Sequence, residues 1–196
     1  MCIRDSSNTI TAGVCTGLGI APSQIGEVIG ISKAYCTRVG AGPFPTELTD
    51  EVGEFLRKEG MEFGATTGRP RRCGWIDIPQ LKYTIMLNGV TQLVITKIDV
   101  LDKFETLQVG TAYEINGKKT NTLPYDLCGY EVNPVLEGHP GWQADLTKIQ
   151  SYGELPYNAK SYVQYLEQLL EVPISIVSVG PGRKQLVFKD VSVVAS

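Results

Sequence analysis

The chain has 196 residues, of which 42% are hydrophobic, so it is long enough to bury a core and form one large domain or two small ones. Its 18 basic and 21 acidic residues argue against nucleic acid as the main partner, because dedicated nucleic-acid binders usually carry a basic excess. The five cysteines include no CxxC pair, and no apolar run approaches the length of a membrane helix. We therefore expect a cytoplasmic protein with reduced cysteines and no membrane segment.

The first part of the chain predicts helices. Apolar residues between Ser23 and Arg38 recur at mainly helical spacing, and the pattern ends at the glycine-rich stretch 40–43, so we expect one helix followed by a loop. A second predicted helix, ended by Gly60, has one apolar face made of Leu48, Val52, Phe55 and Leu56. Residues 78–87 fit a third helix.

The middle of the chain predicts strands. Residues 92–95 form a short apolar run rich in β-branched side chains, which is typical of a buried strand. Residues 107–115 and 118–123 flank Asn116-Gly117, the strongest short signal for a hairpin, and 130–136 is expected to be another strand. We expect this region to be antiparallel.

Near the C-terminal end, the residues around 162–170 have the spacing of an amphipathic helix, and strands are predicted at 174–178 and 185–188 around a Gly-Pro-Gly turn. The whole order predicts an α/β fold with a mainly parallel central sheet, flanking helices and antiparallel hairpin additions. No repeat or long linker marks an internal boundary, so we expect one unit.

The first stretch with chemical character is the loop Gly64–Arg72, which holds two threonines and three arginines between glycines. A guanidinium group offers a planar fork of donors that matches carboxylate or phosphate, and glycine lets the backbone approach a ligand closely. The loop therefore predicts an anion-binding site. The alternative is a solvated basic turn.

The second stretch is Val94–Asp99, a predicted strand that ends in a lysine and an aspartate. In open α/β sheets, ligands bind outside the carboxyl ends of the strands. The Asp99 carboxylate can accept from the ring N–H and the exocyclic amine of guanine, a donor pair that adenine lacks, and the Lys97 stem can pack on the purine face. The alternative is a surface charge pair.

The third stretch, Ser178–Arg183, follows another predicted strand. Its hydroxyl and glycine amides can contact the edge of a ring, and the alternative is a simple turn before a hairpin. Neither GxxxxGK[ST] nor GxGxxG occurs, and the single histidine, His139, is expected in a surface turn between Gly138 and Pro140. Without clusters of cysteine or histidine, a zinc site has no support.

Four segments, in this order along the chain, resemble the adenylosuccinate synthetase family. They are GAGPFPTEL (Gly40–Leu48), EFGATTGRPRRCGW (Glu62–Trp75), TKIDVLD (Thr96–Asp102) and PISIVSVGPGR (Pro173–Arg183). The resemblance extends from about Ser6, with the SSNT stretch, to at least Val187. This family uses GTP to condense IMP with L-aspartate, and it makes adenylosuccinate, GDP and phosphate on the route to AMP.

The resemblance implies a role for each matching residue. It implies an aspartate-binding loop made of Ala65, Thr66, Thr67, Gly68, Arg69, Pro70 and Arg71. It implies a GTP site made of Arg71, Lys97, Ile98, Asp99, Ser178, Val179 and Gly180. IMP would contact Val39 and Arg69.

The resemblance also implies parts that this sequence does not contain. About half of a typical family chain is missing, with the phosphate loop, the aspartate base, the histidine and the ligands of Mg²⁺, so the fold is expected to be incomplete and this chain inactive alone. Residues 1–5 are interpreted as a non-native start, with Asp5 where the family has a threonine, and 6–196 as the C-terminal part of one catalytic domain. Family members are generally homodimers, and the arginine that a partner lends to the IMP site would lie in the missing part.

Two other functions remain open on the sequence alone. The chain could be a non-catalytic module that binds guanine nucleotides through the same pocket. It could also bind RNA through Arg69, Arg71 and Arg72, which would require a steep loss of affinity with salt.

Overall fold

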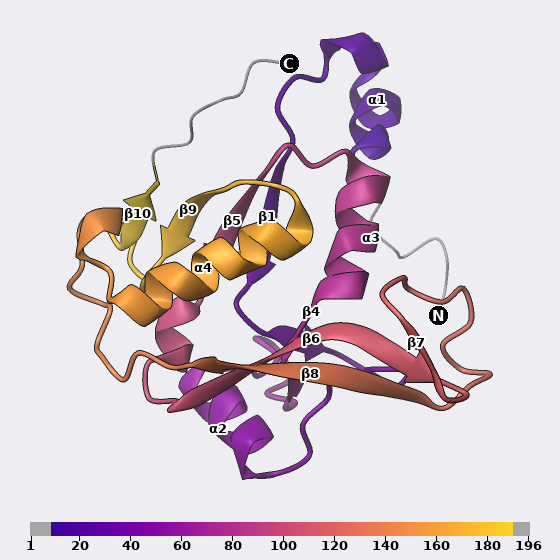
Figure 1. Ribbon diagram of the computed structural model, residues 1–196. Helices are drawn as coiled ribbons and strands as arrows, with labels where there is room; N and C mark the ends of the chain where they lie inside the picture. The colour runs from indigo at the N-terminus through magenta and orange to yellow at the C-terminus, as the bar shows by residue number, and fades with distance from the viewer. Residues whose placement is uncertain (1–8, 190–196) are drawn as a thin grey trace.

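The computed structural model describes residues 9–189 (Figure 1), so the expectations for residues 1–8 lie outside it. Its main sheet has the strand order β1-β5-β9-β10. Strands β1 (Ile29–Lys33), β5 (Gln92–Thr96) and β9 (Ile174–Ser178) are parallel, and β10 (Leu186–Phe188) is antiparallel to β9. This arrangement confirms the predicted α/β fold with a mainly parallel sheet.

Three of the four α-helices confirm sequence predictions: α2 (Glu51–Glu59), α3 (Ile78–Asn88) and α4 (Tyr157–Leu170). Asp50 and Asp77 cap α2 and α3, because each carboxylate accepts from a backbone N–H three residues on, at 3.1 Å. Figure 1 shows α4 lying across the parallel strands, and its buried residues belong to the same core cluster as those of β5 and β9. This packing supports the sheet from one face.

A second sheet extends below the first one in Figure 1. Strand β4 (Ile76–Asp77) is parallel to β6 (Thr106–Ile115), which pairs with β7 (Lys118–Thr120) and β8 (Val132–Pro140) in antiparallel fashion. Asn116 and Gly117 both have positive φ, 52° and 73°, as a type I′ hairpin turn requires, so the predicted antiparallel hairpin is confirmed. A small pair, β2 (Cys36–Arg38) with β3 (Arg72–Gly74), is also antiparallel.

The predicted helix between Ser23 and Arg38 is wrong. This stretch contains a short 3₁₀ turn, η2 (Pro22–Gln24), followed by β1 and β2. Ile29 and Ile31 alternate with Gly30, and a Cβ at Gly30 would stand only 2.8 Å from the Leu93 side chain of β5. Gly30 pairs with Leu93, which is 63 residues further along the chain. This close pairing with β5 therefore outweighs the helical spacing of the apolar residues in this stretch.

Two further features differ from the sequence interpretation. Helix α1 (Ala12–Leu18) was not predicted, and it has no buried residue, so it lacks the apolar stripe that would reveal it. His139 lies inside β8, opposite Leu107, and not in a surface turn. Its ring stacks against Tyr165 with 4.0 Å between centroids, and burial lowers the pKa of the imidazole.

The connections that matter for the site are short. The 3₁₀ turn η3 (Ile98–Leu101) follows β5 after one residue, and η4 (Tyr152–Glu154) precedes α4. Within residues 9–189, no helix combines the length and the apolar character needed to cross a membrane.

Candidate functional site

The carboxyl ends of three neighbouring parallel strands meet at one edge of the main sheet. Lys33 ends β1 opposite Thr96 of β5, and Ile95 of β5 lies opposite Val177 of β9. The segments that follow β5 and β9, which are the second and third stretches singled out in the sequence, are therefore neighbours in space. This edge is the usual place for a ligand in an open α/β sheet.

Lys97 occupies the first position after β5 and has a left-handed backbone, with φ of 61°. Its ammonium donates to the Gly60 carbonyl oxygen and, at 3.0 Å, to Oε1 of Glu62. Two of its three N–H donors are thus used inside the protein. The aliphatic stem is the part of Lys97 that remains for a ligand, which fits the predicted contact with a purine face.

Glu62 holds together a group of side chains whose association the sequence did not predict. We define the Glu62 cluster by its members: Lys33, Tyr35, Glu62, Arg71 and Lys97. The Glu62 side chain is fully buried, and it accepts from Lys33 Nζ at 2.8 Å, the Tyr35 hydroxyl at 2.7 Å and Arg71 Nη1 at 2.8 Å. Its four donors come from three separate segments of the chain, because Lys33 and Tyr35 lie close together at the end of β1.

The charge of Glu62 is secured by these donors. Burial by itself raises the pKa of Glu62, but hydrogen bonds from Lys33, Tyr35, Lys97 and Arg71 outweigh it and hold the pKa at about 2. Burial, together with the bond to Glu62, raises the pKa of Tyr35, so the hydroxyl remains a donor. The cluster is therefore one carboxylate facing three cations at neutral pH.

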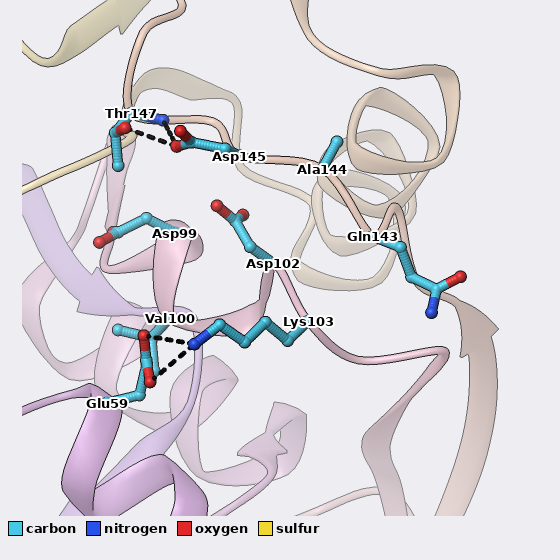
Figure 2. A pocket seen from close by; sticks show the side chains of 9 residues that line it. All are labelled: Glu59, Asp99, Val100, Asp102, Lys103, Gln143, Ala144, Asp145 and Thr147. Atoms are coloured by element: carbon cyan, nitrogen blue, oxygen red, sulfur yellow. Dashed lines mark hydrogen bonds and ion pairs between the residues drawn. The ribbon is translucent and has the colours of Figure 1, made fainter.

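Asp99 lies in η3 and lines a cavity of about 490 Å³. Figure 2 shows the nine residues around it: Glu59, Asp99, Val100, Asp102, Lys103, Gln143, Ala144, Asp145 and Thr147. Lys103 is paired with Glu59, and Thr147 donates to Asp145, whereas no interaction joins Asp99 to the other eight. Burial raises the pKa of Asp99, although the nearby Lys97 charge opposes this shift. Asp99 thus presents an acceptor that no other residue of the cavity uses.

The turn after β9 is closed by Gln185. Its Oε1 accepts from Gly182 N at 2.7 Å, and its backbone carbonyl accepts from Val179 N at 2.9 Å. Its Nε2 donates to the Thr147 carbonyl at 2.9 Å, which ties this turn to the cavity that Asp99 lines. A Cβ at Gly180 would stand 2.5 Å from the amide of the Gln185 side chain, so a larger residue there would displace that amide from the turn.

The other predicted members of the base site differ in exposure. The Ser178 hydroxyl donates to the Gly180 carbonyl at 3.0 Å, whereas the side chains of Ile98 and Val179 are fully buried. Ile98 and Val179 can therefore reach a ligand only through their backbones, and they anchor η3 and the turn after β9 in the core.

The predicted anion-binding loop projects from the body of the protein. Gly64 N donates to the Arg69 carbonyl at 2.9 Å, and Gly68, with φ of 63°, donates to Gly64 O at 2.8 Å. The exposed residues of the loop are Ala65, Thr66, Thr67, Gly68, Arg69 and Pro70. No ion pair involves Arg69 within residues 9–189, so its guanidinium is available to an anion.

Arg71 and Arg72 have internal partners instead. Arg71 belongs to the Glu62 cluster, and Arg72 pairs with Glu47 and donates to the carbonyls of Gly40 and Gly42 at 3.1 and 2.9 Å. Two of the three guanidiniums proposed for RNA are therefore already neutralised, which weakens that alternative. Val39, which is 75% exposed, directly follows β2, and the anion-binding loop directly precedes β3. The antiparallel pairing of β2 with β3 therefore places Val39 and this loop on the same two-stranded unit.

Sequence reasoning missed Glu62, Lys33, Tyr35 and Gln185. Glu62 stood inside a matching segment but showed no spacing that would distinguish it from a surface acid, and its partners lie up to 35 residues away. Only the meeting of chain segments in the folded structure brings Lys33 and Tyr35 to Glu62, and Gln185 to Thr147. In the described part of the chain, no group of three or more histidine, cysteine, aspartate or glutamate side chains lies together in a way that could hold a metal ion.

Comparison with known proteins agrees with the geometry. The family profile of adenylosuccinate synthetase matches residues 4–187. The chain is 54% identical over 192 residues to adenylosuccinate synthetase from Cytophaga hutchinsonii, covering 97% of this chain and 44% of that protein. It is 59% identical over 183 residues to the synthetase from Phocaeicola vulgatus, covering 93% and 43%.

A solved structure of fully ligated adenylosuccinate synthetase from Plasmodium falciparum superposes with a TM-score of 0.90 at 40% identity, covering 94% of this chain and 45% of that one. The chain thus spans less than half the length of the relatives it matches. Family profile, sequence relatives and structure agree, and the chain belongs to the adenylosuccinate synthetase family.

Proposed function

We propose that this chain supplies the guanine and aspartate sites of a GTP-dependent ligase that joins IMP and L-aspartate to adenylosuccinate, with release of GDP and phosphate. The observation that carries the proposal is the meeting of two segments at one sheet edge. Asp99 lines the cavity, the turn after β9 is tied to Thr147 of the same cavity through Gln185, and the Asp99 carboxylate has no partner among the cavity residues. Such an acceptor fits the two neighbouring donors of guanine.

In this proposal the base lies at the carboxyl edge. Asp99 accepts from the ring N–H and the exocyclic amine, the Lys97 stem supports one face, and Ser178 with the backbone of Val179 and Gly180 lines the ring edge. Ile98 contributes its backbone. The energetic reason for selectivity is that adenine would leave the half-buried Asp99 carboxylate facing an acceptor.

The exposed loop takes the second substrate. Thr66 and Thr67 donate hydroxyl hydrogen bonds to L-aspartate, Arg69 binds a carboxylate, and the backbone of Ala65, Gly68 and Pro70 shapes the loop. Arg69 and Val39 contact IMP, and Arg71 reaches toward both aspartate and GTP. The exposed guanidinium of Arg69, which forms no ion pair with the residues that the structure describes, supports this role.

The chemistry itself belongs to a longer protein. We propose transfer of the GTP γ-phosphoryl group to the IMP 6-oxygen, followed by displacement of phosphate by the amine of L-aspartate. Positioning and charge stabilisation dominate such transfers, and Mg²⁺ would assist through ligands outside this chain. The 196-residue chain is expected to bind but not to catalyse, and the longer protein to work as a cytoplasmic homodimer.

The test uses a full-length chimaera in which residues 4–187 replace the matching segment of the Cytophaga hutchinsonii relative. Asp99→Asn should raise the KM for GTP roughly 5- to 150-fold, because an unpaired guanine donor costs on the order of 1 to 3 kcal/mol. The variant should also gain use of XTP, whose 2-oxo group can accept from the new amide. Steady-state kinetics with GTP and XTP measure both effects.

Asp145→Asn is the matched control, since Asp145 lines the same cavity but is occupied by Thr147. It should leave the KM for GTP unchanged. Unaltered GTP kinetics in Asp99→Asn would remove Asp99 from the guanine site.

A non-catalytic nucleotide module is the second candidate, and the unused acceptor of Asp99 is compatible with it. Isothermal titration of the chimaera with GTP separates the two functions. The non-catalytic module would be favoured if the affinity for GTP does not change when IMP and aspartate are added and no adenylosuccinate is formed.

A further inference from the structure

The Glu62 cluster connects the two halves of the proposed site. Lys97, which the proposal assigns to guanine, donates to Oε1 of Glu62 at 3.0 Å, and Arg71, which it assigns to the aspartate loop, donates to Oε2 at 2.8 Å. The two cations therefore use the two oxygens of one carboxylate. The Glu62 side chain itself is fully buried and cannot touch a substrate.

We infer that Glu62 is a positioning residue that holds Lys97 and Arg71 in one fixed arrangement. The position of the guanine site relative to the aspartate loop is then fixed by this one carboxylate. This inference rests on the proposed function for the roles of the two cations, whereas the link between them rests on the geometry of the Glu62 cluster alone.

The backbone around Glu62 is held firmly enough to act in this way. Glu62 N donates to the Arg57 carbonyl of α2 at 2.8 Å, and its own carbonyl accepts from Arg71 N at 2.9 Å. The backbone of Glu62 is therefore fixed to α2 on one side and to the residue before β3 on the other. Arg71 is attached to Glu62 by both its backbone and its side chain.

Lys97 depends on the same carboxylate for its direction. Its left-handed backbone turns the side chain back from the end of β5 toward Gly60 and Glu62, where the ammonium is bound. A lysine stem has four rotatable bonds, and anchoring its ammonium removes that freedom. Without Glu62 the ammonium would keep only the Gly60 carbonyl oxygen as an acceptor, and three cations would face one another without a carboxylate between them.

The decisive experiment is a double-mutant cycle in the full-length chimaera. Glu62→Gln should raise the KM for GTP and the KM for aspartate, each by about tenfold or more, because it removes charge-assisted hydrogen bonds to both cations. Lys97→Met, which keeps an unbranched stem but has no ammonium, should raise the KM for GTP only. In the Lys97→Met background, Glu62→Gln should raise the KM for GTP by a smaller factor than in the wild type, because only its effect through Arg71 remains, and it should still raise the KM for aspartate.

Other results would overturn the inference. A purely structural Glu62 would lower the amount of folded enzyme and kcat while leaving both KM values unchanged, and effects that multiply fully in the double variant would show that Glu62 does not act through Lys97. Lys82→Met is the control, because Lys82 forms a comparable ion pair with Glu171 on the surface and should alter neither KM.

Two additional measurements keep the inference testable if Glu62→Gln folds poorly or the chimaera is inactive. Glu62→Asp keeps the charge but is one methylene shorter, so it should serve only one of the two cations and raise at least one KM. In the 196-residue chain, NMR should show slow hydrogen exchange at Lys97 Nζ and the Arg71 guanidinium, and Glu62→Asp should speed it at one of them.

These results separate the two hypotheses. If the wild-type chimaera makes no adenylosuccinate, while Lys97 and Arg71 are protected from hydrogen exchange in the 196-residue chain, the proposed function is refuted. The connection of Lys97 and Arg71 through Glu62 would then still stand. The positioning role of Glu62 would be refuted if the chimaera is active and neither Glu62 variant changes the KM for GTP or for aspartate. Fast hydrogen exchange at both Lys97 and Arg71 in the wild-type chain would also refute it.

Discussion

Arg69 and Arg71 are two residues apart, yet the structure gives them different tasks. Arg71 is bound to the fully buried Glu62 carboxylate, whereas Arg69 is exposed and forms no ion pair within the described range 9–189. Loss of Arg71 would therefore leave a buried charge short of a donor, while loss of Arg69 would remove only a contact with a ligand. Sequence spacing alone treats them as equivalent.

Arg69→Leu should impair the handling of aspartate or IMP without loss of stability. Because the guanidinium is exposed and forms no ion pair with residues 9–189, the free energy of unfolding of the 196-residue chain, measured in urea, should change by no more than about 0.5 kcal/mol. In the full-length chimaera the KM for aspartate or for IMP should rise about tenfold or more, as expected for a lost charge-assisted hydrogen bond. A variant with normal dependence on both substrates would contradict the loop assignment, and Lys119→Leu on the distant hairpin is the control.

Gly60→Ala should destabilise the fold. A Cβ there would stand 2.1 Å from the Tyr35 hydroxyl oxygen and 2.7 Å from the Leu56 carbonyl oxygen, so the Glu62 cluster and the end of α2 would both have to move. Overpacking of this kind costs roughly 1 to 3 kcal/mol, which urea unfolding can measure. Gly26→Ala, where a Cβ meets nothing within 4 Å, should be close to neutral, and equal stabilities of the two variants would refute the steric argument.

At the scale of elements, Asp102 joins the end of η3 to the segment 142–146. Its Oδ1 accepts from Trp142 Nε1 at 2.7 Å, and its Oδ2 accepts from Leu146 N at 2.9 Å. Burial raises the pKa of Asp102 to about 6, and these two hydrogen bonds only partly oppose the shift. The segment 142–146 beside the cavity in Figure 2 is thus held by a carboxyl group whose pKa is about 6.

Asp102→Asn should flatten the pH dependence of stability between about pH 4 and pH 6. Since the folded pKa of about 6 lies above the ordinary value of 3.8, the folded state binds the proton more tightly. The stabilisation is full below the unfolded pKa and is lost as the pH rises through about 6. Urea midpoints at several pH values measure the slope.

Asp126→Asn, in an exposed turn, is the control and should keep the wild-type slope. Glu62 contributes with the opposite sign, because its pKa of about 2 is lowered, and its stabilisation is lost only as the pH falls from about 4.5 toward 2. The two effects therefore occupy different pH windows. An unchanged slope in Asp102→Asn would show that Asp102 is not the group responsible.

At the scale of the whole molecule, β1 forms one end of the main sheet in the part of the chain that the structure describes. Ile29 and Ile31 on this strand are 53% and 76% exposed, and a cavity of about 970 Å³ extends between β1, α1 and α3. An exposed apolar edge strand is a template for pairing with another chain. Self-association of the 196-residue chain is the expected consequence.

Ile31→Lys should reduce this self-association, because a charged side chain on an edge strand opposes pairing with a second copy. Sedimentation of the 196-residue chain at increasing concentration should show a smaller share of oligomers for the variant. Tyr157→Lys replaces an apolar side chain that is 82% exposed at the start of α4, away from the edge, and serves as the matched control. Equal sedimentation of both variants and the wild type would argue against association through β1.

Local sequence signals were sufficient to predict elements whose conformation is specified by a few neighbouring residues. The Asn116-Gly117 turn, the apolar face of α2 and the β-branched run of β5 were all recognised, since a positive φ, helical periodicity or strand composition is encoded within a few neighbouring residues. The motif order likewise sufficed to recognise the family, and the strand ends that carry Asp99 and Ser178 were correctly expected at a sheet edge.

Only the tertiary structure decided the rest. The stretch before Arg38 became strand because Gly30 packs against Leu93 of β5, a contact that no local window contains. Glu62 became the centre of a buried ion cluster because the ends of β1 and β5 and the start of β3 converge on it. A single sequence specifies backbone preferences over short ranges, whereas the partners of a buried charge are chosen by contacts between distant segments.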